Sequence, residues 1–123
     1  GESQVLVEAL DGLDAKAQVR PADLTQIDMR KLELARAMAA KPRLLISDED
    51  MAGLSHAEVD AILPILFALN ERGLTIIMIE HIMRAVMAFS QRLVVLVSGK
   101  KIADGKPADV VDNPEVIGAY LGQ

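Results

Sequence analysis

Acidic residues and a histidine follow two aliphatic runs in the middle of the chain. Three consecutive carboxylates, residues 48–50, come directly after the run 43–47, and Glu80 and His81 come directly after the run 74–79. Strands rich in leucine and isoleucine bury both faces in parallel sheets, and ligands bind at their carboxyl ends. Carboxylates there suit a hydrated Mg²⁺ and a polarised water, because hard cations prefer oxygen ligands. The alternative is a strand that ends at a solvated acidic loop.

Helical and extended patterns alternate around these runs. The spacing of Ser55 and Glu58 predicts a capping box, and Ser98-Gly99 predicts a hairpin turn. We expect helices over 3–13, 26–40, 55–72, 82–90 and from Pro114, and strands over 43–47, 74–79, 92–97 and 100–103. Strands separated by helices predict an α/β fold, with a mostly parallel sheet, flanking helices and a C-terminal hairpin.

Composition excludes several classes of protein. The 123 residues carry a formal net charge of -5, include no cysteine and contain only one tyrosine, two phenylalanines and no tryptophan. Without a basic stripe or a stacking platform, the chain is not expected to bind nucleic acid. Without cysteine it has neither disulfides nor thiolate metal sites. No apolar run reaches the ~20 residues that span a bilayer, so we expect a cytoplasmic protein of one domain.

Five motifs occur in an order that resembles one family. Residues 32–37 (LELARA) resemble the helix that follows the signature sequence of ATP-binding-cassette (ABC) ATPases, and residues 44–49 resemble their Walker B strand. Residues 53–55 resemble the D-loop, and His81 lies where the family carries its switch histidine. The tail, residues 113–122, is similar to the end of the ATP-binding subunits of branched-chain amino acid importers.

This resemblance implies a partial P-loop NTPase core, the C-terminal half of a nucleotide-binding domain. Residues 1–40 would form the signature-helix region, and residues 41–123 the part from Walker B to the C-terminus. Such a subunit couples ATP hydrolysis to amino acid import, with ATP and Mg²⁺ as cofactors. Its expected partners are a membrane permease and a second ATPase subunit, so it would be cytoplasmic and peripheral to the inner membrane.

The resemblance also assigns roles to individual residues. Asp48 would hold a water on Mg²⁺, Glu49 would polarise the attacking water, and His81 would touch the γ-phosphate. These roles are coherent, because phosphoryl transfer depends on positioning and charge neutralisation. On base rates, a histidine at a strand end is otherwise structural or solvated. The candidate cofactor-binding residues, at signature and D-loop positions, are Thr25, Gln26, Asp28, Gly53, Leu54 and Ser55.

The chain departs from the family pattern at three places. It contains no Gly-x-x-x-x-Gly-Lys-Ser/Thr motif, so the phosphate-loop strand is missing and nothing cradles phosphates. Gln26 and Ile27 replace glycines of the signature, and their Cβ atoms obstruct a close backbone approach. Asp50 stands where the family carries proline and places a third carboxylate beside Asp48 and Glu49. We therefore expect the isolated chain to be inactive.

Two other functions compete with this interpretation. The first is a non-catalytic remnant that dimerises or docks on protein partners, since a missing strand leaves apolar edges unpaired and favours a homo-oligomer. The second is a phospho-acceptor receiver domain, which has a similar length and an aspartate at a strand end. That alternative is disfavoured because the chain opens with a predicted helix and has no acidic pair at an early strand end.

Overall fold

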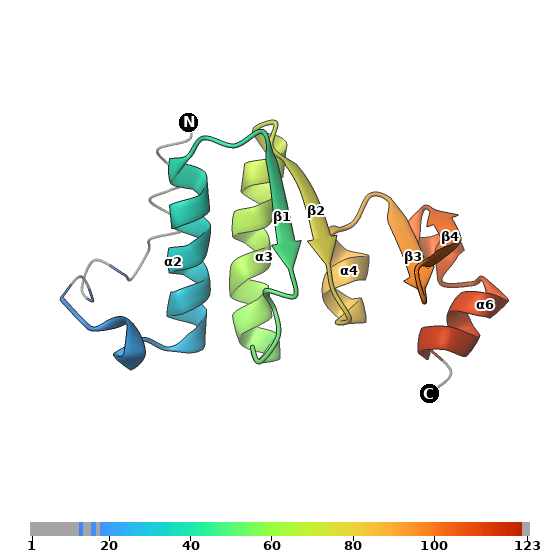
Figure 1. Ribbon diagram of the computed structural model, residues 1–123, viewed down its shortest axis with the longest axis horizontal. Helices are drawn as coiled ribbons and strands as arrows, with labels where there is room; N and C mark the ends of the chain where they lie inside the picture. Colours follow the sequence, from blue (N-terminus) through green and yellow to red (C-terminus); the bar gives the residue numbers. More distant parts are fainter. Residues whose placement is uncertain (1–12, 14–15, 17, 122–123) are drawn as a thin grey trace. The chain divides into compact units, whose positions relative to one another are not determined.

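The computed structural model describes residue 13, residue 16 and residues 18–121, and it divides into two compact units between His81 and Ile82. The expected helix 3–13 therefore lies, apart from Leu13, outside the described residues. Within the described part of the chain each unit contains one two-stranded sheet, so the mostly parallel sheet expected from the sequence is a parallel pair and a separate hairpin. Figure 1 labels the main elements.

The elements agree with the predicted ones to within about two residues, which is the usual uncertainty of element ends. In chain order they are η2 (Pro21–Asp23), α2 (Gln26–Ala39), β1 (Leu44–Asp48), α3 (His56–Glu71), β2 (Thr75–Ile79), α4 (Met83–Phe89), β3 (Leu93–Val97), β4 (Lys100–Gly105), α5 (Pro107–Val110), α6 (Pro114–Val116) and η3 (Ile117–Leu121). The last helix continues from α6 as the π-helical η3. Among the described residues, no helix is both long and apolar enough to cross a membrane.

The first unit packs two helices on one face of a parallel strand pair. Strands β1 and β2 are in register from Leu44 opposite Thr75 to Asp48 opposite Ile79. Helices α2 and α3 stand side by side next to this pair (Figure 1). Side chains alternate between the faces of a strand, which is why Ser47 is buried while Asp48 is exposed. The apolar stripe of α3 supplies most of the core, namely Val59, Ile62, Leu63, Ile65, Leu66 and Leu69.

The opposite face of the β1–β2 pair is apolar and exposed. Leu44, Ile46, Ile77 and Ile79 are 46%, 57%, 48% and 45% exposed, respectively. Parallel sheets normally bury both faces beneath helices. Four exposed aliphatic side chains on adjacent strands therefore form a surface suited to packing against further polypeptide. We call these four residues the open sheet face.

Side-chain caps fix the ends of the two long helices. The Ser55 hydroxyl accepts a hydrogen bond from the Glu58 backbone N–H at 3.2 Å, and the Glu58 carboxylate accepts one from the Ser55 N–H at 3.0 Å. The predicted capping box is thus confirmed. Thr25 caps α2 in the same way, with its hydroxyl oxygen 3.3 Å from the Asp28 nitrogen. Helix α3 ends before Gly73, whose φ of 101° lies in the left-handed region that glycine adopts without strain.

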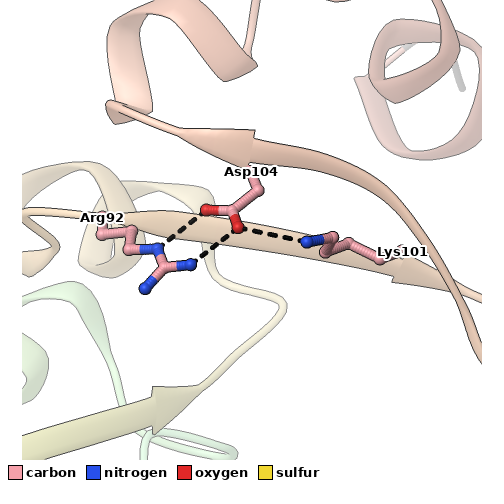
Figure 2. Close-up of polar contacts among 3 residues, drawn as sticks. All are labelled: Arg92, Lys101 and Asp104. Atoms are coloured by element: carbon pink, nitrogen blue, oxygen red, sulfur yellow. Dashed lines mark hydrogen bonds and ion pairs between the residues drawn. The ribbon is translucent and has the colours of Figure 1, made fainter.

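The second unit is built on the antiparallel β3–β4 hairpin. Ser98 and Gly99 both have positive φ, 50° and 79°, as a two-residue type I′ turn requires. The Arg92 guanidinium donates two hydrogen bonds to the Asp104 carboxylate, at 2.8 and 2.7 Å, and the Lys101 ammonium lies 3.4 Å from the same group (Figure 2). These contacts with Arg92 first, and then Lys101, lower the pKa of Asp104 to about 2. This charged network ties β3 to β4 outside the ladder.

The C-terminal turns of the chain are attached to the hairpin. Asn113 caps α6 by accepting a hydrogen bond from the Glu115 N–H at 2.9 Å, as the sequence predicts. The Tyr120 hydroxyl, from η3, donates to the Leu96 carbonyl on β3 at 2.5 Å. This bond joins the last described turn to a strand 24 residues earlier in the chain. In the second unit, the C-terminal turn η3 is therefore bonded to strand β3 of the hairpin.

Candidate functional site

The first unit brings two of the predicted site residues into direct contact. Strands β1 and β2 end side by side, with Asp48 opposite Ile79, so the residues that follow them emerge at one edge of the sheet. There the His81 Nε2 atom lies 2.6 Å from the Glu49 Oε1 atom. The His81 side chain is 74% exposed and that of Glu49 is 49% exposed. The two predicted catalytic residues thus form a solvent-accessible pair at the carboxyl ends of parallel strands, where α/β sheets bind ligands.

The backbone of Glu49 is strained in a way that the sequence did not reveal. Its φ is 54°, which is uncommon for a residue other than glycine and costs on the order of 1–2 kcal/mol. The Glu49 N–H donates to the Ile79 carbonyl at 2.8 Å, so the ladder between the strands continues one residue past the end of β1. The left-handed turn comes immediately after this bond. Strain of this kind clusters at functional sites.

The three consecutive carboxylates do not share one environment. Asp48 and Glu49 are exposed, whereas the Asp50 carboxylate accepts a hydrogen bond from the Ser47 hydroxyl at 2.9 Å. Ser47 is only 2% exposed and lies on the face of β1 that the helices cover. The expectation that Asp50 crowds Asp48 and Glu49 is therefore wrong, because a buried hydroxyl takes its carboxylate in another direction.

Two predicted residues from different elements meet at the start of α2. A Cβ atom on Gly53 would lie 2.5 Å from the Gln26 Oε1 atom, so the Gln26 side chain occupies the space that only a glycine leaves free. Gly53 also has a φ of 79°. The positive φ favours glycine at this position, and a larger residue would also require the Gln26 side chain to shift. The signature-like and D-loop-like segments are thus in contact.

Asp28 is directed toward a residue that sequence reasoning did not single out. Its side chain is 11% exposed and forms an ion pair with Lys16, whose side chain is 39% exposed. The hydrogen bond from Lys16, followed by the one from Thr25, holds the pKa of Asp28 below its ordinary value. Lys16 lies 12 residues upstream in a connecting segment, so no periodic pattern marks it. The Asp28 carboxylate is therefore paired with Lys16 in this structure.

The remaining predicted residues lie in the loop from β1 to α3. The Ser55 hydroxyl is engaged in the helix cap, and the Leu54 N–H donates to the Met51 carbonyl at 3.2 Å. Met51 is completely buried, and its own N–H donates to the Glu80 carboxylate at 3.1 Å. The sequence analysis placed Glu80 among the carboxylates at the strand ends without a partner of its own, and it did not single out Met51. The burial of one residue and the long-range contact of the other leave no local signal in the sequence.

Comparisons with known proteins show which family the chain belongs to. A family described as "Branched-chain amino acid ATP-binding cassette transporter" matches residues 100–123. The high-affinity branched-chain amino acid transport ATP-binding protein BraF of Pseudomonas aeruginosa is 44% identical over 95 residues, which cover 76% of this chain and 37% of that protein. LivG of Escherichia coli, with the same description, is 39% identical over 113 residues, which cover 91% of this chain and 44% of that protein. The chain spans less than half the length of these curated relatives.

Solved structures share the fold. An ATP-binding cassette of an ABC transporter in its ADP conformation aligns with a TM-score of 0.79 and 24% identity, over 99% of this chain and 50% of that chain. A nucleotide-free cassette aligns with a TM-score of 0.82 and 23% identity, over 99% and 51%. The fold is therefore part of an ABC-transporter ATP-binding cassette. The chain is a C-terminal portion of an ATP-binding subunit of that family, and it resembles the branched-chain amino acid type.

Proposed function

We propose that the chain supplies the hydrolytic edge of an ATP-binding subunit that couples ATP hydrolysis to import of branched-chain amino acids or similar substrates. In this proposal Glu49 polarises the attacking water, and His81 orients Glu49 and contacts the γ-phosphate. Residues 1–123 are one partial nucleotide-binding domain. The subunit works with a membrane permease and a second ATPase subunit, which places it at the cytoplasmic face of the inner membrane. The chain alone does not hydrolyse ATP.

One observation carries this proposal, the contact of 2.6 Å between the His81 Nε2 and Glu49 Oε1 atoms. It supports the proposal because it joins two candidate residues at the sheet edge where α/β proteins bind ligands. The His81 side chain is 74% exposed and the Glu49 side chain is 49% exposed, so a water molecule and a phosphate can reach both of them. A base that is held in this way contributes typically ~10²–10⁴-fold to a reaction rate.

The residues present fit Mg²⁺ and ATP in part. No group of three or more histidine, aspartate or glutamate side chains in the described chain is close enough to hold a metal ion. A Mg²⁺ ion in a phosphoryl-transfer site needs fewer protein ligands than this, because one or two carboxylates, waters and the substrate phosphates complete its coordination shell. Asp48, exposed at the end of β1, would supply such a carboxylate. When bound, the ion neutralises phosphate charge. The backbone cradle for the phosphates must come from residues that this sequence does not contain.

Calorimetric titration of the chain with Mg²⁺ and a slowly hydrolysed ATP analogue tests this division of roles. We expect no saturable binding tighter than about 1 mM, which corresponds to about -4 kcal/mol. Saturable binding below that concentration would contradict the proposal, because it requires a phosphate site within these 123 residues.

A second function is favoured by the open sheet face. Four aliphatic side chains that are 45–57% exposed on adjacent parallel strands invite association with another polypeptide. We propose as the alternative that the chain is a non-catalytic dimerisation or docking module, either as a homo-oligomer or bound to an ATPase subunit. The two functions differ in one respect: docking requires the open sheet face but does not require Glu49.

A further inference from the structure

Three contacts from the end of β2 hold the strained segment that follows β1. The Ile79 carbonyl accepts from the Glu49 N–H at 2.8 Å, and His81 lies 2.6 Å from the Glu49 carboxylate. Between them in sequence, the Glu80 Oε2 atom accepts from the Met51 N–H at 3.1 Å. The first contact is made by the N–H of the left-handed residue itself, and the Glu80 contact follows that residue by two positions. Glu49 is thus fixed on both sides.

The Glu80 contact satisfies a backbone donor of a fully buried residue. Met51 is 0% exposed, so its N–H needs a protein acceptor or an ordered water. A carboxylate oxygen is a strong acceptor, and it comes from a residue 29 positions away in sequence. A left-handed conformation at a glutamate persists only where the surrounding structure over-determines it. The Ile79 carbonyl holds the start of this turn, and the Ala52 N–H donates to the Glu49 carbonyl at 3.1 Å across it. Glu80 and the buried Met51 side chain hold its end.

We infer that Glu80 is a positioning residue that holds the Glu49 backbone in its left-handed conformation and thereby presents the Glu49 carboxylate to His81. Glu80 acts only through the Met51 N–H. Its proposed role requires no contact with a reacting group or with a phosphate. Its consequence for hydrolysis rests on the proposed function, but the positioning itself does not. A measurement on the chain without nucleotide therefore separates failure of this inference from failure of the proposed function.

Nuclear magnetic resonance of the full 123-residue chain provides two local readouts. The one-bond Cα–Hα coupling of Glu49 reports the sign of its φ, and hydrogen exchange of the Met51 amide reports its hydrogen bond. In Glu80→Ala we expect Met51 exchange to accelerate roughly tenfold or more, as loss of a hydrogen bond to a charged group implies. The Glu49 coupling should move away from its left-handed value. Glu71→Ala, which removes an exposed carboxylate at the end of α3, should change neither readout.

Two further variants separate the effect of the length of the Glu80 side chain from the effect of its charge. They remain informative if Glu80→Ala does not fold. Glu80→Gln keeps an acceptor oxygen at the same distance from the backbone, so both readouts should stay near their original values. Glu80→Asp keeps the charge but is one methylene shorter, so it should behave like the alanine variant. Unchanged readouts in Glu80→Ala, or native values in Glu80→Asp with altered ones in Glu80→Gln, would overturn the inference.

Discussion

The His81 Nε2 atom lies 2.6 Å from the Glu49 Oε1 atom, although the two residues are 32 positions apart in sequence. Both side chains are largely in contact with solvent. Exposed pairs of this kind contribute a median of roughly 0–1 kcal/mol to stability. The contact is therefore better explained by the orientation that it gives to the Glu49 carboxylate than by the stability that it adds.

His81→Ala should accordingly leave the fold nearly intact. We expect the free energy of unfolding, measured by urea denaturation, to fall by less than about 1 kcal/mol. Leu66→Ala, which truncates a side chain that is 2% exposed in the core, should cost about 2–5 kcal/mol. A loss in His81→Ala as large as that in Leu66→Ala would mean that the pair is structural.

The Lys16–Asp28 ion pair should contribute a pH-dependent share of stability. Because contact with Lys16 holds the Asp28 pKa below 3.8, the contribution is complete above that value and is lost as pH falls further. Asp28→Asn should lower the free energy of unfolding at pH 7 by about 1.5–3 kcal/mol. The difference from the original chain should shrink progressively below pH 3.8. Asp112→Asn, at an exposed site, is the control, and a pH-independent difference for Asp28→Asn would refute this account.

The hairpin network should titrate over a defined range. Asp104 has its pKa lowered from 3.8 to about 2 by Arg92 and Lys101, so its stabilising effect is present above pH 3.8 and disappears as pH falls through 2. Arg92→Gln should lower the melting temperature at pH 7, and this difference should vanish near pH 2. Carboxyl-carbon resonances would follow the Asp104 pKa directly. A pKa near 3.8 in the original chain would show that the two hydrogen bonds are absent in solution.

The open sheet face should drive association of the isolated chain. Light scattering at rising protein concentration should detect a dimer or a larger oligomer. Ile46→Lys and Ile77→Lys place charges on this face and should shift the chain toward monomer. Leu96→Lys, at a similarly exposed position of the second unit, is the matched control and should have no such effect. If the original chain is strictly monomeric at high concentration, the open sheet face is not a self-association surface.

The sequence was sufficient to predict the elements and the Glu49–His81 edge. Continuous aliphatic runs and the Ser55–Glu58 spacing are strong local signals, and parallel strands place their carboxyl ends together. Asp50 and Asp28 could not be placed in this way. Each finds its partner, Ser47 or Lys16, through side-chain packing that depends on the folded arrangement. The role of Glu80 was likewise invisible, because its partner is a backbone N–H in a loop 29 residues away.

The central claim is that Glu49 acts on ATP once the rest of a cassette is present. The most direct test is ATP hydrolysis by a chimaera in which this chain replaces the matching 113 residues of Escherichia coli LivG. We predict turnover by the chimaera, none by the isolated chain, and a decrease of about 10²–10⁴-fold in Glu49→Gln but not in Glu71→Gln. Hydrolysis by the isolated chain, or equal turnover in Glu49→Gln and the parent chimaera, would contradict the account.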